Sequence, residues 1–100
     1  MTGEPTRSSE ARVTTTMPGR YLTQLCKHFQ HKRPVTLEPD RGRIEFTGGA
    51  CTLRAEDNMQ ALSLVAGDEA ALTMLEDVVA RHLLRFAFRE APDIHWTRAA

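Results

Sequence analysis

Residues 35–66, VTLEPDRGRIEFTGGACTLRAEDNMQALSLVA, decide the fold that we expect from this sequence. Their apolar residues alternate with more polar neighbours, which is the pattern of β-strands that bury one face. Three clusters that tolerate turn geometry, PDRG, TGG and EDN, divide the segment. The segment therefore predicts an antiparallel meander of four strands. Its alternating apolar residues are Val35, Leu37, Ile44, Phe46, Cys51, Leu53, Ala55, Leu62 and Leu64.

On either side of this meander, the apolar period changes to that of an amphipathic helix. From about Gly19 to Lys32, apolar residues recur at helical spacing, and Pro34 stops the pattern. Asp68 can cap a second helix, which ends no later than Pro92. The two apolar stripes are Leu22, Leu25, Cys26 and Phe29 in the first helix, and Ala71, Leu72, Leu75, Val78, Val79, Leu83 and Phe86 in the second.

The two ends of the chain complete the pattern. Residues 1–10 are polar and lack periodicity, so we expect a disordered tail. ARVTTT, from Ala11, and DIHWT, which contains Ile94 and Trp96, each predict one strand. The expected fold class is therefore α+β, with element order β-α-β-β-β-β-α-β in a single domain over residues 11–98. Two helices would cover one face of a mostly antiparallel sheet of five to six strands, as a two-layer sandwich.

Composition excludes several classes of partner. The chain has 100 residues, with 13 Lys plus Arg and 13 Asp plus Glu, and this balance argues against a general binder of nucleic acid or of anionic membranes. The N-terminal residues lack the apolar run of a secretory signal, and no segment reaches the roughly 18 apolar residues of a membrane span. Cys26 and Cys51 suit a reducing compartment. We expect a cytoplasmic protein with no nucleic-acid and no membrane partner.

The stretch LCKHFQHK, residues 25–32, places Cys26, His28 and His31 close together in sequence, as metal ligands often are. A helix turns about 100° per residue, so Cys26 points into the core and lies roughly 160° from His28. One ion cannot reach donors on opposite sides of a helix, and the remaining pair, His28 and His31, does not close a tetrahedral site. The pattern favours surface histidines, and we expect no metal and no resident cofactor. Cys26 and Cys51 both face the predicted core, which favours buried small hydrophobes over nucleophiles.

The second helix contains a titratable residue in its apolar stripe. His82 falls in the middle of this stripe, where it needs a hydrogen-bond partner. It is either a core histidine bonded to backbone or hydroxyl, or a histidine that faces a ligand or transfers a proton.

Beside this stripe, Arg81, Arg85 and Arg89 recur every fourth residue and form a ridge. They can hold carboxylates or phosphates, or they can form a solvated face that pairs with Asp77 or Glu90. Leu84 and Phe88 point away from the stripe and suggest a partner surface.

Four segments carry a resemblance to a known family: RYLTQLCKHFQHK, RGRIEF, GACTLRAE and LEDVVARHLLRFAFREAPDIHWTR. In this order they resemble a small uncharacterised bacterial family, the domain of unknown function numbered twenty-two eighteen, over about residues 11–98. The resemblance implies no established activity. Domains similar to this one are attached to siderophore-interacting flavoproteins or encoded near iron-uptake functions, which implies a helper role in iron acquisition. The most distinctive residues of the resemblance are Tyr21, Cys26, Lys27, His28, His31, Lys32, Arg81, His82, Arg85, Phe86 and Arg89.

Two hypotheses of function follow, and neither requires an enzyme. The first is a binding module whose groove holds a small anionic ligand such as a ferric siderophore or haem. The second is an interaction protein that uses Leu84 and Phe88 to form a homodimer or to dock a flavin reductase, with purely structural histidines. An acid–base enzyme would need a second titratable group near His28 or His82, for which Glu45 and Glu56 are available. The groove of the first hypothesis would be lined by Tyr21, His28, Arg81, His82, Arg85 and Arg89.

Overall fold

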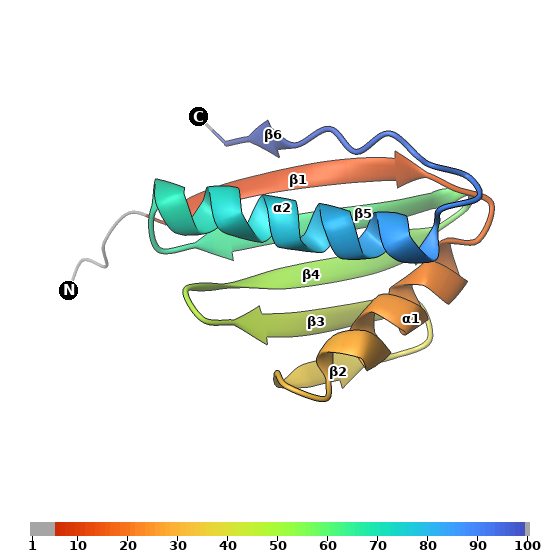
Figure 1. The fold of residues 1–100 in the computed structure, drawn as a ribbon, viewed down its shortest axis with the longest axis horizontal. Helices are drawn as coiled ribbons and strands as arrows, with labels where there is room; N and C mark the ends of the chain where they lie inside the picture. Colours follow the sequence, from red (N-terminus) through yellow and green to blue (C-terminus); the bar gives the residue numbers. More distant parts are fainter. Residues whose placement is uncertain (1–5, 100) are drawn as a thin grey trace.

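The meander and its two flanking helices are arranged as the sequence predicts in a computed structural model that describes residues 6–99. These residues form two helices and six strands in the order β-α-β-β-β-β-α-β. Both helices lie on the same face of the sheet, and its other face is open (Figure 1). The elements are β1 (Arg7–Thr14), α1 (Pro18–Phe29), β2 (Val35–Leu37), β3 (Arg41–Phe46), β4 (Gly49–Glu56), β5 (Met59–Ala66), α2 (Glu69–Phe86) and β6 (Thr97–Arg98).

The sheet has the strand order β2-β3-β4-β5-β1-β6, and every neighbouring pair is antiparallel. The first four strands of this order are the predicted meander. Tight turns connect β3 to β4 and β4 to β5, and they use Gly48 at φ 89° and Asn58 at φ 51°. Glycine and asparagine tolerate this left-handed region, which hairpin turns need. The N-terminal strand β1 then pairs with β5 on one side and with β6 on the other, so the first and last strands lie side by side at one edge of the sheet.

The hydrophobic core lies between the sheet and the two helices. Alternate strand residues are buried on the helix side, and the predicted stripe of each helix, except Val78 of α2, packs on them. Fully burying one leucine contributes about 1.5–3 kcal/mol, so this layer holds the fold together. The core leucines and isoleucine are Leu22, Leu25, Ile44, Leu53, Leu62, Leu64, Leu72, Leu75 and Leu83.

Two glycines let the helices approach the sheet closely. A Cβ on Gly42 of β3 would lie 2.5 Å from Cys26 Sγ, and a Cβ on Gly49 of β4 would meet the Val65 carbonyl oxygen of β5 first and would lie 2.7 Å from Leu75 Cδ1. Each glycine therefore provides the space that one helix side chain fills. Cys26 and Cys51 are both fully buried and unbonded to each other, as predicted.

The first strand begins earlier than predicted. β1 starts at Arg7 rather than Ala11, because β5 and β6 flank this segment and supply hydrogen-bond partners on both sides. Ser9 is consequently buried at 4% exposure. The predicted tail is therefore wrong for residues 7–10, and residues 1–5 lie outside the part that the structure describes.

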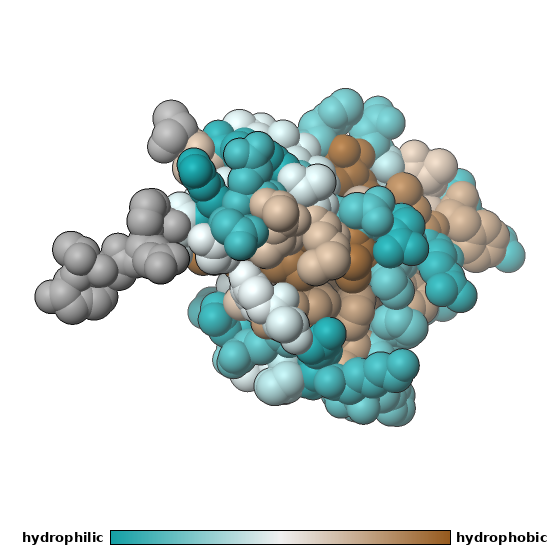
Figure 2. Space-filling model, turned by 60° about the vertical axis from the view of Figure 1, so that its left-hand side comes forward, coloured by the Kyte–Doolittle hydropathy of each residue, from teal (hydrophilic) through white to brown (hydrophobic). Residues whose placement is uncertain are grey.

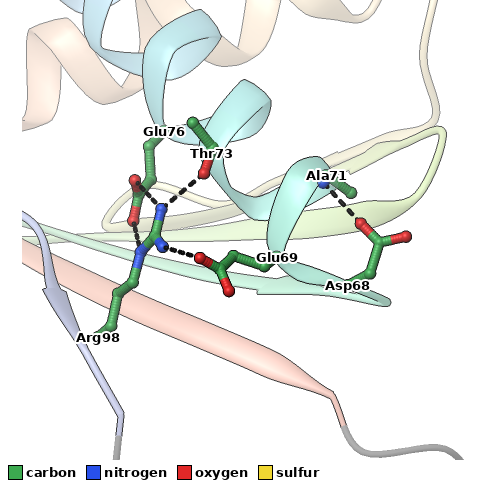
Figure 3. A network of polar contacts seen from close by, with 6 residues as sticks. All are labelled: Asp68, Glu69, Ala71, Thr73, Glu76 and Arg98. Atoms are coloured by element: carbon green, nitrogen blue, oxygen red, sulfur yellow. Dashed lines mark hydrogen bonds and ion pairs between the residues drawn. The ribbon is translucent and has the colours of Figure 1, made fainter.

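The last strand is shorter than predicted and lies further along the chain. β6 consists of Thr97–Arg98, whereas residues 91–96 are irregular, although Ile94 and Trp96 pack against the core. Arg98 holds this strand against α2. Its guanidinium donates to Glu76 at 2.9 and 3.1 Å and to Thr73 Oγ1 at 2.8 Å, and Glu69 lies 3.7 Å away (Figure 3). The bond to Arg98 lowers the pKa of Glu76.

The capping of α2 agrees with the sequence. Asp68 accepts a hydrogen bond from the Ala71 backbone N–H at 2.7 Å, which satisfies one free donor of the first helical turn (Figure 3). Neither described helix is long and apolar enough to cross a membrane.

Candidate functional site

The N-terminal half of α1 lies close to the C-terminal end of α2, at the right of Figure 1. Side chains from these two helix ends line a groove. It has a volume of about 500 Å³. One side comes from α1 and the residue before it, and the other comes from the last turn of α2 and the segment that follows. We call it the arginine groove, and its lining residues are Met17, Arg20, Tyr21, Gln24, Arg85, Phe86, Phe88 and Arg89.

Three positive charges and an aromatic wall define the chemistry of this groove. Within residues 6–99, none of Arg20, Arg85 and Arg89 forms an ion pair with a carboxylate. The guanidinium of Arg89 lies 5.6 Å from the centre of the Phe88 ring, which is 67% exposed. A groove with this lining can hold an anion and cover an apolar body at the same time.

The position of Tyr21 in this groove is fixed by Glu90. The tyrosine hydroxyl donates to a Glu90 carboxylate oxygen at 2.9 Å, and Thr15 Oγ1, Thr16 N and Thr16 Oγ1 donate to the same carboxylate at 3.0–3.1 Å. The backbone bond from Thr16 is the largest cause that lowers the pKa of Glu90, and the bond to Glu90 raises the pKa of Tyr21. Tyr21 therefore stays protonated, and its oxygen can only accept a further hydrogen bond.

A second hollow, the histidine pocket, lies along the same pair of helices. It has a volume of about 380 Å³ and is lined by His28, Phe29, His31, Lys32, Arg33 and His82. The rings of His28 and His82 lie 4.9 Å apart between centroids and are tilted by 42°. Phe86, which lines the arginine groove, also lies 5.7 Å from the His28 ring. The two hollows are therefore neighbours.

His82 occupies a different place from the predicted one. It is half-buried rather than in the core, because α1 lies beside α2 and His82 faces that helix, while Leu75, Val79 and Leu83 fill the core. Its Nδ1 lies 2.7 Å from the carbonyl oxygen of Val78. A carbonyl only accepts hydrogen bonds, so Nδ1 carries the proton and Nε2 of the neutral ring keeps its lone pair.

The pKa of His28 is lowered by its position between the two helices. Desolvation lowers its pKa, and His82, Arg85, His31 and Lys32 add to the effect through their positive charge.

The structure divides the candidate residues of the sequence between the two hollows. Tyr21, Arg85 and Arg89 line the arginine groove, and His28 and His82 line the histidine pocket. Arg81 lines neither hollow, because it pairs with Asp77 at 2.9 Å, which was one of the two alternatives for the arginine ridge. The other alternative partner, Glu90, bonds Thr15, Thr16 and Tyr21 instead.

Sequence reasoning missed Arg20 and Gln24 as groove residues. Their spacing of four places them on one side of α1, and this signal was available. This spacing alone does not indicate a binding site, because that side of α1 becomes a groove wall only where α2 packs next to it.

Large apolar side chains remain on the surface near the groove. Leu84 and Phe88, the predicted partner surface, are 38% and 67% exposed, and Met17 is 45% exposed. Apolar surface between hydrophilic flanks also occurs away from the groove, in Figure 2, which brings the left-hand side of Figure 1 forward. The surface is therefore not uniformly polar.

Cysteine chemistry does not contribute to either hollow. Burial raises the pKa of Cys26 to about 11 and that of Cys51 to about 12. Neither thiol ionises near neutral pH, so neither is a nucleophile. Among residues 6–99, no three His, Cys, Asp or Glu side chains are grouped closely enough to hold a metal ion.

Comparisons with known proteins agree with the fold. The model of a family described as an uncharacterized protein conserved in bacteria, DUF2218, matches residues 10–97. Among solved structures, the chain is similar to the NMR structure of PA4090 from Pseudomonas aeruginosa, with 39% sequence identity and a TM-score of 0.77. The match covers 93% of this chain and 96% of that chain. No curated protein matches the sequence.

Proposed function

The chain belongs to DUF2218, an uncharacterised family conserved in bacteria, and we propose that it is a non-catalytic module that binds a small anionic ligand in the arginine groove. The observation that carries this proposal is the convergence of Arg20, Arg85 and Arg89 on one hollow without a carboxylate partner within the described residues. Guanidinium groups bind carboxylates and phosphates through paired hydrogen bonds.

The lining of the groove also restricts the shape of the ligand. Arg20 belongs to α1, whereas Arg85 belongs to α2, so a bound anion would bridge the two helices. Phe86 and Phe88 offer apolar surface for a planar body, and Tyr21 can accept a hydrogen bond from a ligand hydroxyl. A hydroxylated aromatic acid has all three features. The resemblance to domains attached to siderophore-interacting flavoproteins suggests a ferric siderophore or haem as larger ligands of this class.

The arrangement of titratable groups supports a binding role over catalysis. Glu45 and Glu56, the two acids that could have served a histidine, alternate with helix-facing residues and lie on the open face of the sheet. They pair there with Arg43 and Arg54. Neither carboxylate faces the helices, so neither supplies His28 or His82 with a second titratable group.

Calorimetric titration with 2,3-dihydroxybenzoate tests the proposal. We expect binding to the native protein and a loss of about tenfold or more in Arg85→Gln, because a hydrogen bond to a charged group contributes about 1.5–3 kcal/mol. Arg81→Gln is the matched control, since Arg81 lies on the same helix but pairs with Asp77 outside the groove. Equal affinities of the two variants, or no binding of this acid or of haemin to the native protein, would contradict the proposal.

A second candidate function is an interface formed by Leu84, which is exposed in the last turns of α2, and Phe88, which is exposed just after this helix. A homodimer or a docked flavin reductase would cover them. Light scattering after size exclusion separates the homodimer from a binding module that acts alone, because a homodimer doubles the mass of 11.2 kDa. Phe88→Ser would then restore the single mass.

A further inference from the structure

The two histidines that meet between the helices form a pair that the arginine groove does not explain. His28 comes from α1 and His82 from α2, and both line the histidine pocket beside that groove. We propose that His28 and His82 together coordinate a transition-metal ion that arrives as the complex of an anionic chelator. The inference rests on the proposed function for the anionic part of the complex.

The spacing of the two rings suits one shared metal. Two imidazoles that bind a metal at about 2.0–2.1 Å have centroids about 4.5 Å apart at a right angle and about 5.2 Å apart at the tetrahedral angle. The centroids of His28 and His82 lie 4.9 Å apart, inside this interval. Both residues lie on helices that pack on the same core, so their backbones are held side by side.

The hydrogen bond of His82 prepares the ring for coordination. Metal-binding histidines usually donate the second ring N–H to a carbonyl or carboxylate, which fixes the tautomer and the orientation of the ring. His82 Nδ1 donates to the Val78 carbonyl at 2.7 Å, so its Nε2 lone pair is free of any proton in the neutral ring. The residue therefore has the second contact that a metal ligand needs.

The surroundings of the pair favour a complexed ion over a free one. The described residues offer no third His, Cys, Asp or Glu close enough to complete a site, so the remaining positions must come from another ligand. Lys32 and Arg33 line the same pocket, and Arg85 acts on His28 from the adjoining groove. These positive charges repel a free dication, whereas they attract a metal whose chelator makes the whole complex negative.

Nickel(II) nitrilotriacetate is the probe that tests this inference. The chelator leaves two adjacent positions of the octahedral metal open, and the complex is anionic. Calorimetry on protein without a histidine tag should show one complex per chain, and the visible absorption of nickel should shift as nitrogen replaces water. His28→Asn and His82→Asn should each weaken binding at least about tenfold, because each removes one of two protein ligands.

His31→Asn is the control that decides between two histidine pairs. His31 lies in the same pocket, in the turn just after the end of α1, so it could form the pair with His28 instead. We expect His31→Asn to bind the nickel complex with the affinity of the native protein. We expect the same of His95→Asn. If His31→Asn loses affinity and His82→Asn keeps it, or if the native protein does not bind the complex, the inference is overturned.

Two further measurements distinguish a wrong metal site from a misfolded variant and from a wrong proposed function. Electron paramagnetic resonance of copper(II) iminodiacetate bound to the native protein should show two imidazole nitrogens on the metal. This measurement uses no variant, so it does not depend on whether a variant folds. A single imidazole nitrogen would overturn the inference. Both histidine variants should still bind metal-free 2,3-dihydroxybenzoate. If that acid binds and the nickel complex does not, metal coordination is wrong and the proposed function stands. If the complex binds through both histidines and the acid does not, metal coordination stands and the proposed function is wrong.

Discussion

Glu90 shows how one residue in an irregular segment can organise a site. Its carboxylate accepts four hydrogen bonds, from Thr15, Thr16 and Tyr21, and so joins the chain after α2 to the turn between β1 and α1. Both walls of the arginine groove depend on this junction, because Tyr21 lines one wall and Phe88 and Arg89 precede Glu90 in the other. Glu90 is therefore a positioning residue for the groove.

The pH dependence of stability should reveal this role. The hydrogen bonds lower the pKa of Glu90 in the folded state, so its contribution is complete above the unfolded pKa of about 4.3 and is lost as pH falls through the lower folded value. We expect Glu90→Gln to be less stable than the native protein at pH 7 in urea unfolding. The difference should shrink steadily as pH falls below about 4.

Glu45→Gln provides the comparison, since Glu45 is exposed on the open face of the sheet and lies 4.0 Å from Arg43. This variant should change stability little at any pH. A Glu90→Gln variant as stable as the native protein at pH 7 would show that the four hydrogen bonds do not hold the junction.

For single residues, burial can be predicted from the sequence where it depends on the period of one helix alone. The burial of Cys26 follows from the helical period alone, whereas Phe88 is exposed in the turn that follows α2. His82 was placed in the core because the neighbouring helix, which it faces, comes from a distant segment. Glu90 was considered only as a partner of the arginines, whereas its carboxylate bonds Tyr21 from a distant segment. A histidine at the edge of an apolar stripe and one at its centre look alike until the neighbouring helix is placed.

Among the elements, α1 and β3 approach each other only because Gly42 has no side chain. We expect Gly42→Ala to destabilise the protein by about 1–3 kcal/mol, since an added Cβ would lie 2.5 Å from Cys26 Sγ. Urea unfolding measures the change.

A double variant identifies the cause of that destabilisation. Cys26→Ala removes the sulfur that the new Cβ would meet, so Gly42→Ala should cost less in this background. The rescue should be incomplete, because the Thr36 carbonyl oxygen would still lie 3.3 Å from the added carbon. If the two changes are additive, the packing of α1 on β3 does not depend on this contact.

Element boundaries were predictable where turns or caps mark them. Asp68 begins α2 as expected, and the turns at Gly48 and Asn58 separate three strands of the meander. The limits of β1 and β6 were not predictable from local pattern. Both are set by pairing with strands from elsewhere in the chain, and β6 also needs the contact of Arg98 with α2.

For the whole molecule, the spacing of apolar residues predicts a layer of helices on a sheet. It does not predict how the two helices are placed relative to each other. Alternation shows which strand residues face the helices, and this was enough to predict the two-layer sandwich. The contact between His28 and His82, and hence both hollows, depends on the relative position of α1 and α2 on the sheet. That position results from packing over the entire core.

Because both helices pack on one continuous core, the molecule should unfold as a single unit. Leu22 of α1 and Leu83 of α2 are 0% and 1% exposed in the same cluster. Replacing either by alanine should cost about 2–5 kcal/mol. In each variant, urea unfolding followed by far-ultraviolet circular dichroism should coincide with unfolding followed by the fluorescence of Trp96, which packs against that core.

The alternative is that α1, with the groove wall that it forms, unfolds at a lower urea concentration than α2 and the sheet. In that case Leu22→Ala would separate the two unfolding curves, whereas Leu83→Ala, whose helix lies over the centre of the sheet, would keep them together (Figure 1). Separate curves would mean that the arginine groove and the histidine pocket open independently of the sheet. Coincident curves would mean that both hollows are as rigid as the core, because Arg20, His28, His82 and Arg85 lie on helices that cannot leave the core without unfolding the whole chain.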